Sequence, residues 1–219
     1  MKLHLTASLA GLALCVPATA LAAQAPSNLQ SAPMLTPDAG KGDSWTYRNP
    51  QASFASYQSF MIQPTAVYTG AGTQWGSSTP EQRQRYAAYM TEALRKELSQ
   101  SYTVVDKPGP GIATLRLTLM GVQNTVGGVA TASRLTPMGI ALNGIQSLRG
   151  KKGSMTGSVT AAIEVMDSQN GALLFAAVRQ RSPDALDIES TLSTEKTVEA
   201  VADDIAKSIR KGIDRANGR

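Results

Sequence analysis

Residues 113–121 read Ala-Thr-Leu-Arg-Leu-Thr-Leu-Met-Gly, and this stretch decides the fold. Leucine stands at positions 115, 117 and 119, with polar residues between them. An alternation with a period of two is typical of a β-strand with one buried and one solvated face. Residues 157–166 repeat the alternation, and the turn-forming sequence 167–171 leads into a further strand over 173–179. The sequence therefore predicts a mainly antiparallel sheet.

Two amphipathic helices are predicted outside these strands. Thr79-Pro80-Glu81 combines an N-cap hydroxyl, a first-turn proline and an acid near the positive end of the helix dipole. Apolar residues then recur every three or four positions up to residue 98, and a second such stripe spans 194–216. Strands with one apolar face and helices with one apolar stripe indicate an α+β fold. We expect a two-layer sandwich with both helices on one face of the sheet. The expected order is β-α-β-β-(insert)-β-β-α.

The chain of 219 residues suits one such domain, expected over residues 45–219, with a long insert at about 124–154. Residues 1–22 resemble a secretory signal peptide: Lys2 precedes an apolar stretch, and Ala20 and Ala22 suit cleavage before residue 23. A periplasmic or secreted protein is expected. The alternative is an outer-membrane lipoprotein anchored through Cys15, although leucine precedes this cysteine where a lipidation signal prefers a small residue. Residues 23–44, rich in proline and glycine, are expected to form a flexible leader.

The positions of histidine and cysteine in the sequence exclude several kinds of catalytic and metal site. The only histidine, His4, and the only cysteine, Cys15, both fall in the signal region. The remaining chain therefore lacks the residues of Ser-His-Asp triads, Cys-His pairs and ordinary zinc sites. We expect no enzyme activity, no cofactor and no metal. The net charge of +5 is spread along the chain, which does not favour a nucleic-acid partner.

Two residue patterns could carry chemistry, and a structural role explains each one better. Ser-x-x-Lys occurs at Ser193 and at Ser208, but the companion motifs of penicillin-recognising enzymes are missing, so Ser193 is interpreted as a helix cap. Glu164 and Asp167 could form an acid pair. Asp167 is instead expected to bond backbone groups of its turn, and Glu164 to pair with Arg116 on a neighbouring strand.

Several segments resemble one known family. They are Tyr47-Arg48-Asn49-Pro50, Tyr57 with the strand containing Pro64 and Val67, Val104-Val105-Asp106-Lys107-Pro108-Gly109-Pro110-Gly111, Leu115-Arg116-Leu117, Thr156-Gly157, and Glu164-Val165-Met166-Asp167-Ser168 leading into Gly171 and Leu174. Over roughly residues 45–215 the chain resembles the bacterial exported proteins and lipoproteins of domain-of-unknown-function family 3313. The resemblance implies an envelope location and no particular activity.

Two surfaces are candidates for binding. The first is the expected wet face of the sheet, with Arg116, Thr118, Thr160 and Glu164. The second is a helix over 137–149 within the insert, which either lies on a membrane or partner or only packs on the domain. Its candidate residues are Met138, Leu142, Ile145, Leu148 and Arg149, together with Lys151 and Lys152 directly after it.

The sequence thus predicts a non-enzymatic cell-envelope protein that binds another envelope protein or helps to organise envelope components. The first alternative is a module that binds a membrane surface or a small ligand. A carboxylate-based hydrolase is the second alternative.

Overall fold

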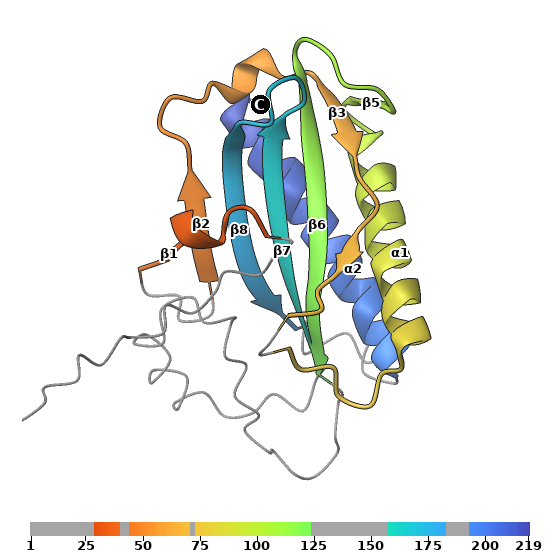
Figure 1. Cartoon of the computed structure of the whole chain (residues 1–219). Coiled ribbons are helices and arrows are strands. Elements are labelled where there is room, and N and C mark those ends of the chain that lie inside the picture. Colours follow the sequence, from red (N-terminus) through yellow and green to blue (C-terminus); the bar gives the residue numbers. More distant parts are fainter. Residues whose placement is uncertain (1–28, 40–43, 71–72, 124–156, 183–192) are drawn as a thin grey trace, which may run out of the picture.

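The structure is a computed structural model that describes residues 29–39, 44–70, 73–123, 157–182 and 193–219. The predicted signal peptide lies outside these ranges. One open sheet of eight strands forms the centre of the described domain (Figure 1). Its strands are β1 (Thr36–Pro37), β2 (Ser44–Arg48), β3 (Ser59–Ile62), β4 (Ala66–Val67), β5 (Thr103–Val105), β6 (Ile112–Gln123), β7 (Ser158–Asp167) and β8 (Leu173–Arg181).

The strand order is β1-β2-β8-β7-β6-β3-β5, and β4 pairs with β6 beyond the end of β3. The pairings β1–β2, β2–β8, β8–β7 and β7–β6 are antiparallel. The pairings of β3 with β5 and β6, and of β4 with β6, are parallel. The α+β prediction is confirmed, and the predicted elements occur in the expected order, but β1 and β2 are additional strands that precede the first predicted one. The first strand expected from the sequence, which contains Pro64 and Val67, is divided into β3 and β4 because Pro64 interrupts it.

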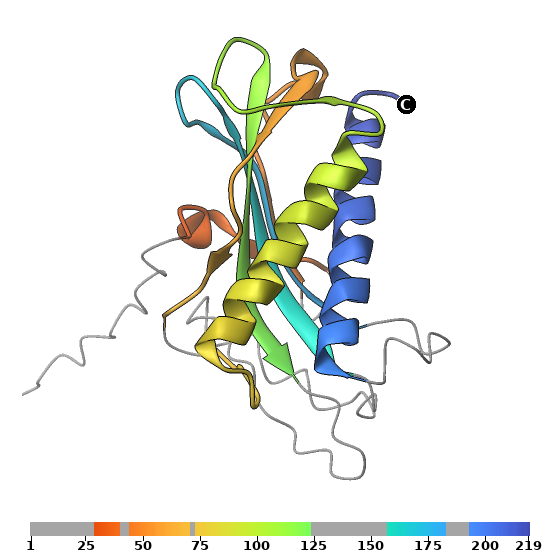
Figure 2. The same ribbon diagram turned by 90° about the vertical axis from the view of Figure 1, so that its right-hand side faces the viewer.

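Both long helices, α1 (Pro80–Leu98) and α2 (Thr194–Ala216), lie on one side of the sheet (Figure 2). The N-terminus of α1 has a complete capping box. The Thr79 hydroxyl accepts from the Gln82 amide, and the Gln82 side chain accepts from the Thr79 amide at 2.8 Å. We call the side of the sheet under α1 and α2 the helix face, and the opposite side the far face.

The helix face carries the larger core. Leu115, Leu117 and Leu119 point into it, as their alternation predicts. They meet the apolar stripes of the two helices, whose buried members include Tyr86, Met90, Leu94, Leu98, Val198, Val201, Ala202 and Ile213.

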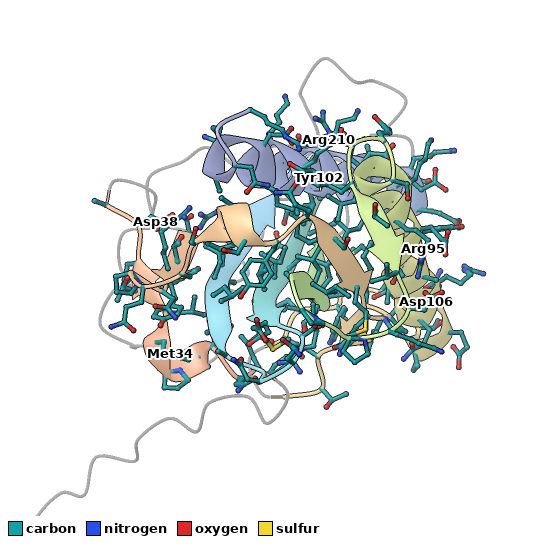
Figure 3. All side chains as sticks on the ribbon, turned by 90° about the horizontal axis from the view of Figure 1, so that it is seen from above. Met34, Asp38, Arg95, Tyr102, Asp106 and Arg210 are labelled. Carbon is teal, nitrogen blue, oxygen red and sulfur yellow. The ribbon has the colours of Figure 1, made fainter. Side chains whose placement is uncertain are left out.

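Polar contacts connect the two helices at their edges. Arg210 Nε donates to Glu97 Oε1 at 2.7 Å, and Arg210 Nη1 donates to Asp214 Oδ2 at 2.8 Å. Tyr102, next to β5, donates to Asp214 Oδ1 at 2.7 Å. Figure 3 shows Tyr102 and Arg210 close together beside α2, and Met34 away from that helix. These contacts fix α2 relative to α1 and the β5 edge.

A second apolar core covers the far face, which the sequence predicted to be exposed to solvent. The described part of the supposed flexible leader folds over this face and includes the 3₁₀ helix η1 (Ala32–Met34), opposite α1 and α2 in Figure 2. Leu29 is only 2% exposed. The prediction of a flexible leader over 23–44 is therefore wrong for residues 29–39, because their few apolar side chains find an apolar surface to cover. A further 3₁₀ helix, η2 (Phe54–Ser56), precedes β3.

Candidate functional site

An ion pair between β6 and β7 lies at the centre of the far face. Arg116 and Glu164 are directly opposite each other in the antiparallel register. Arg116 Nε donates to Glu164 Oε2 at 2.8 Å, and Arg116 Nη2 donates to the same oxygen. The predicted cross-strand pair is confirmed, and so is the prediction that both side chains point away from the helices.

The predicted exposure of this face is wrong. Glu164 is 0% exposed, Thr118 is 1% exposed and Thr160 is 7% exposed. Only the Arg116 side chain keeps appreciable contact with solvent, at 26%. The four candidate residues do lie on one face, but they form no open wet surface. A partner could reach this face only after whatever covers it has moved.

The cover over Glu164 is residues 29–35, which we call the N-terminal segment. Its buried apolar side chains, Leu29, Ala32 and Leu35, recur every third residue. They pack in one cluster with apolar residues of β6, β7 and β8, namely Met120, Ala162, Met166, Ala176 and Val178. The sequence reasoning missed this segment, and the spacing of its three apolar residues was the signal available.

One main-chain hydrogen bond joins the N-terminal segment to the ion pair. The Ser31 amide donates to Glu164 Oε1 at 2.7 Å. Both carboxylate oxygens of Glu164 therefore have donors, one from a side chain and one from the backbone. A buried carboxylate needs such partners, because leaving a buried charge unpaired is very costly.

A second set of contacts holds the chain that follows the N-terminal segment. Arg179 of β8 pairs with Asp38, with 3.0 Å between Nη1 and Oδ2. Arg179 also donates to the side chains of Ser44 and Thr46 in β2, the latter at 2.9 Å. The β1–β2 ladder and this cluster fix the C-terminal end of the N-terminal segment to the sheet.

Some buried hydroxyls on the far face have no hydrogen-bond partner within the described ranges. Among the described residues, none bonds to the buried hydroxyls of Ser31, Thr118 and Thr160. A buried hydroxyl without a partner costs about 1–3 kcal/mol, whereas burying a leucine side chain contributes about 1.5–3 kcal/mol. Burial of an ion pair also returns little net stability. The polar groups therefore offset much of what Leu29 and Leu35 contribute.

A groove of about 320 Å³ lies between the two helices, on the other side of the domain. Its residues are Tyr89, Glu92, Ala93, Lys96, Glu199, Ala202 and Asp203. Tyr89 donates to Glu195 at 2.9 Å, and this hydrogen bond raises the pKa of the tyrosine. The groove is open and its charges are mixed, so it resembles a solvated boundary between helices.

A cluster of loops at one end of the sheet brings together segments that carry the family resemblance. Tyr57 donates to Asp167 Oδ2 at 2.9 Å, while Asp167 Oδ1 accepts from the amides of Gln169 and Asn170. Burial and the contact with Asp167 raise the pKa of Tyr57 to about 12. The amide of Asn170 is the main cause of a lowered Asp167 pKa. Asp167 is thus a turn-forming residue, as predicted.

The loop Pro108-Gly109-Pro110-Gly111 joins the same cluster. The Gly109 amide donates to Ser168 Oγ at 3.0 Å, and this hydroxyl donates back to the Gly109 carbonyl. Gly111 has a φ of +67°, and a Cβ there would stand 3.2 Å from the Ser56 carbonyl oxygen. Glycine is therefore required at this turn. The polar groups of these loops hydrogen-bond to one another. The cluster therefore has a structural role, which is to hold the loops together at one end of the sheet.

The remaining predicted sites are settled in part. Ser193 caps α2, because its hydroxyl accepts from the Lys196 amide at 3.2 Å, as predicted. Within the described ranges, no three His, Cys, Asp or Glu side chains gather to hold a metal ion. Neither α1 nor α2, the long helices of the described chain, is long and apolar enough to cross a membrane. The predicted membrane or partner helix, with Met138, Leu142, Ile145, Leu148, Arg149, Lys151 and Lys152, lies outside the described residues and stays a prediction.

Comparison with known proteins gives one family and several distant structures. The model of a family described as "Protein of unknown function (DUF3313)" matches residues 25–209. Among curated proteins, none matches the chain.

Three solved structures illustrate the distant likeness. The PelC dodecamer of Paraburkholderia phytofirmans is 12% identical, with 73% of this chain and 96% of that chain covered and a TM-score of 0.36. A candidate lipoprotein of Caulobacter crescentus is 14% identical, with 74% and 89% covered and a TM-score of 0.31. A DUF4136 protein of Bacteroides thetaiotaomicron is 16% identical, with 76% and 95% covered and a TM-score of 0.31.

Proposed function

This chain belongs to the DUF3313 family of proteins of unknown function, and from that premise we propose that it is a non-enzymatic cell-envelope protein that binds another envelope protein. The family assignment confirms the resemblance drawn from the sequence. It supplies no reaction, so the proposal has to rest on the site.

One observation carries the proposal: the far face holds a peptide segment over a buried ion pair. Glu164 is fully buried, and it takes one of its hydrogen bonds from the backbone amide of Ser31. Stability alone is a weak reason for a buried ion pair, because apolar residues of similar volume usually stabilise as well or better. A polar group that fixes where a segment docks is a better-supported use of such a pair. The far face thus has the features of a surface that recognises polypeptide.

The envelope location rests on the sequence of residues 1–22, which has the three parts of an export signal. Cleavage before residue 23 would release a periplasmic or secreted protein, and lipidation of Cys15 would give an anchored one. The absence of histidine and cysteine from residues 23–219 supports a binding role over catalysis.

The second candidate function is small-ligand binding in the groove between α1 and α2. Its volume of about 320 Å³ lies at the lower end of the range for small-molecule sites. Lys96 would offer hydrogen-bond donors there, the Tyr89 hydroxyl oxygen could accept, and Glu92, Glu199 and Asp203 would offer carboxylates. This lining favours a polar, cationic ligand.

Two measurements, one in intact cells and one on protein purified from its native envelope, separate these functions. Chemical crosslinking in intact cells, followed by mass spectrometry, should give the same partner protein in independent preparations. Native mass spectrometry of the purified protein should show no bound small molecule. A stoichiometric small ligand without a reproducible protein adduct would contradict the proposal and favour the groove.

A further inference from the structure

We propose that the far face is a peptide-binding site that the N-terminal segment occupies in cis, and that a partner protein binds by replacing this segment with one of its own. This inference rests on the proposed function, because it names the partner chemistry and the regulation of the same site. The occupant in trans is a peptide with apolar residues at positions i, i+3 and i+6 and a free backbone amide at i+2.

The contacts of the N-terminal segment define this chemistry. Leu29, Ala32 and Leu35 supply the apolar positions, and the Ser31 amide supplies the donor to Glu164. The donor is a main-chain group, so another polypeptide with the same apolar spacing can provide it. The Ser31 hydroxyl contributes no bond to any described residue, so serine itself is not required.

The attachment of the N-terminal segment permits such replacement. β1 follows it directly, and Thr36 and Pro37 are paired with Thr46 and Trp45 of β2. Arg179 holds Asp38 beyond β1. These contacts lie outside residues 29–35, so the segment can leave the far face while the edge of the sheet stays intact.

The polar groups of the far face can also be exposed to solvent without the N-terminal segment. Release of the N-terminal segment returns Glu164 and the Ser31 hydroxyl to water, where both are hydrated. Arg116 already reaches solvent and stays opposite Glu164 in the β6–β7 register. What release exposes is an apolar floor formed by Met120, Ala162, Met166, Ala176 and Val178. A floor of this kind calls for a new cover, which the partner peptide supplies.

The test uses the chain 23–219 and a fluorescein-labelled synthetic peptide of residues 29–39 as the probe. Fluorescence anisotropy measures its affinity for wild type, for Leu29→Ser/Leu35→Ser, and for Met34→Ser. The last variant is the matched control, because Met34 lies in the same segment and its side chain is exposed. We expect the double variant to bind the peptide at least tenfold more tightly than wild type, since its cis competitor is weakened. Met34→Ser should bind like wild type.

Equal affinity of all three proteins for the peptide would overturn the proposal, and so would no binding by a double variant that keeps its circular dichroism. If the double variant does not fold, Ser31→Pro replaces it. Proline removes the amide donor to Glu164, and the φ of −77° at Ser31 is compatible with its ring. Ser31→Pro should bind the peptide more tightly than wild type, and unchanged affinity would contradict the proposal.

This test is independent of the search for a partner. Crosslinking to an envelope protein without peptide exchange would leave the proposed function standing and remove the replacement mechanism. Peptide exchange without any crosslinked partner in cells would support the replacement mechanism and contradict the proposed function.

Discussion

The backbone amide of Ser31 donates a 2.7 Å hydrogen bond to the carboxylate of Glu164, which lies 133 residues further along the chain. This contact joins the N-terminal segment to the middle of the sheet and completes the hydrogen bonding of a buried charge. It also accounts for the burial of a face that strand alternation alone marks as wet. The proposed recognition of a partner would therefore depend on the same few atoms that complete the hydrogen bonding of Glu164.

Arg116→Met should destabilise the protein, because it leaves Glu164 buried without its counter-ion. Removing one partner of a buried pair costs about 3–5 kcal/mol, and the partial exposure of Arg116 places the expected loss near the lower limit. Arg116→Met/Glu164→Met should lose less than the two single variants combined. Urea unfolding gives these free energies, and a negligible effect of Arg116→Met would show that the pair behaves as an exposed one.

Ser31→Ala should leave the protein as stable as wild type or stabilise it by up to about 1 kcal/mol, because it removes a buried hydroxyl that has no partner among the described residues. The amide donor to Glu164 is retained in this variant. Thermal unfolding of wild type and Ser31→Ala measures the difference. A clear loss of stability would mean that the hydroxyl makes a contact that this account does not include.

Tyr57 should make the protein less stable as the pH rises from 10 towards 12. Its pKa is raised from 10.0 to about 12 in the folded protein, so the unfolded chain loses the proton first. The stabilisation is complete below pH 10 and is lost as the pH approaches the folded value. Tyr57→Phe should flatten this part of the stability profile. Unfolding measured across this pH range checks it, and identical slopes for both proteins would contradict the account.

Ser193→Ala should cost about 1 kcal/mol of stability through loss of the α2 cap. Ser208, the serine of the second Ser-x-x-Lys spacing, lies inside α2, so Ser208→Ala is the matched control and should change stability little. Denaturant unfolding of both variants compares the two positions. Equal effects would refute the capping role that the structure gives to Ser193.

The sequence was most informative where periodicity and burial agree. Leu115, Leu117 and Leu119 identified both the strand and its helix face, and the Thr79 and Ser193 caps identified where the helices begin. The Arg116–Glu164 pair followed from the same parity. These features are local or depend on one repeated spacing, which is why they could be predicted.

The cover on the far face could not be predicted in the same way. Residues 23–44 are poor in large apolar side chains, and only Leu29, Ala32 and Leu35 mark the contact. Their cluster includes Trp45 and Tyr68, but most of its other members, from Met120 to Val178, lie more than eighty positions later in the chain. Such a long-range contact has no local signature, so strand parity correctly gave the direction of Glu164 and wrongly gave its exposure.

The central claim is that the protein binds an envelope partner at its far face. Site-specific photo-crosslinking in cells tests this claim most directly. A photoreactive phenylalanine derivative is placed at Tyr47, a half-buried β2 residue that packs against the apolar core of the far face. In a separate variant it is placed at Tyr89, in the groove between α1 and α2. Both changes replace one tyrosine with a similar aromatic residue. The account predicts a discrete, reproducible protein adduct from position 47 and none from position 89. An adduct from position 89 alone, or no adduct from either position, would contradict it.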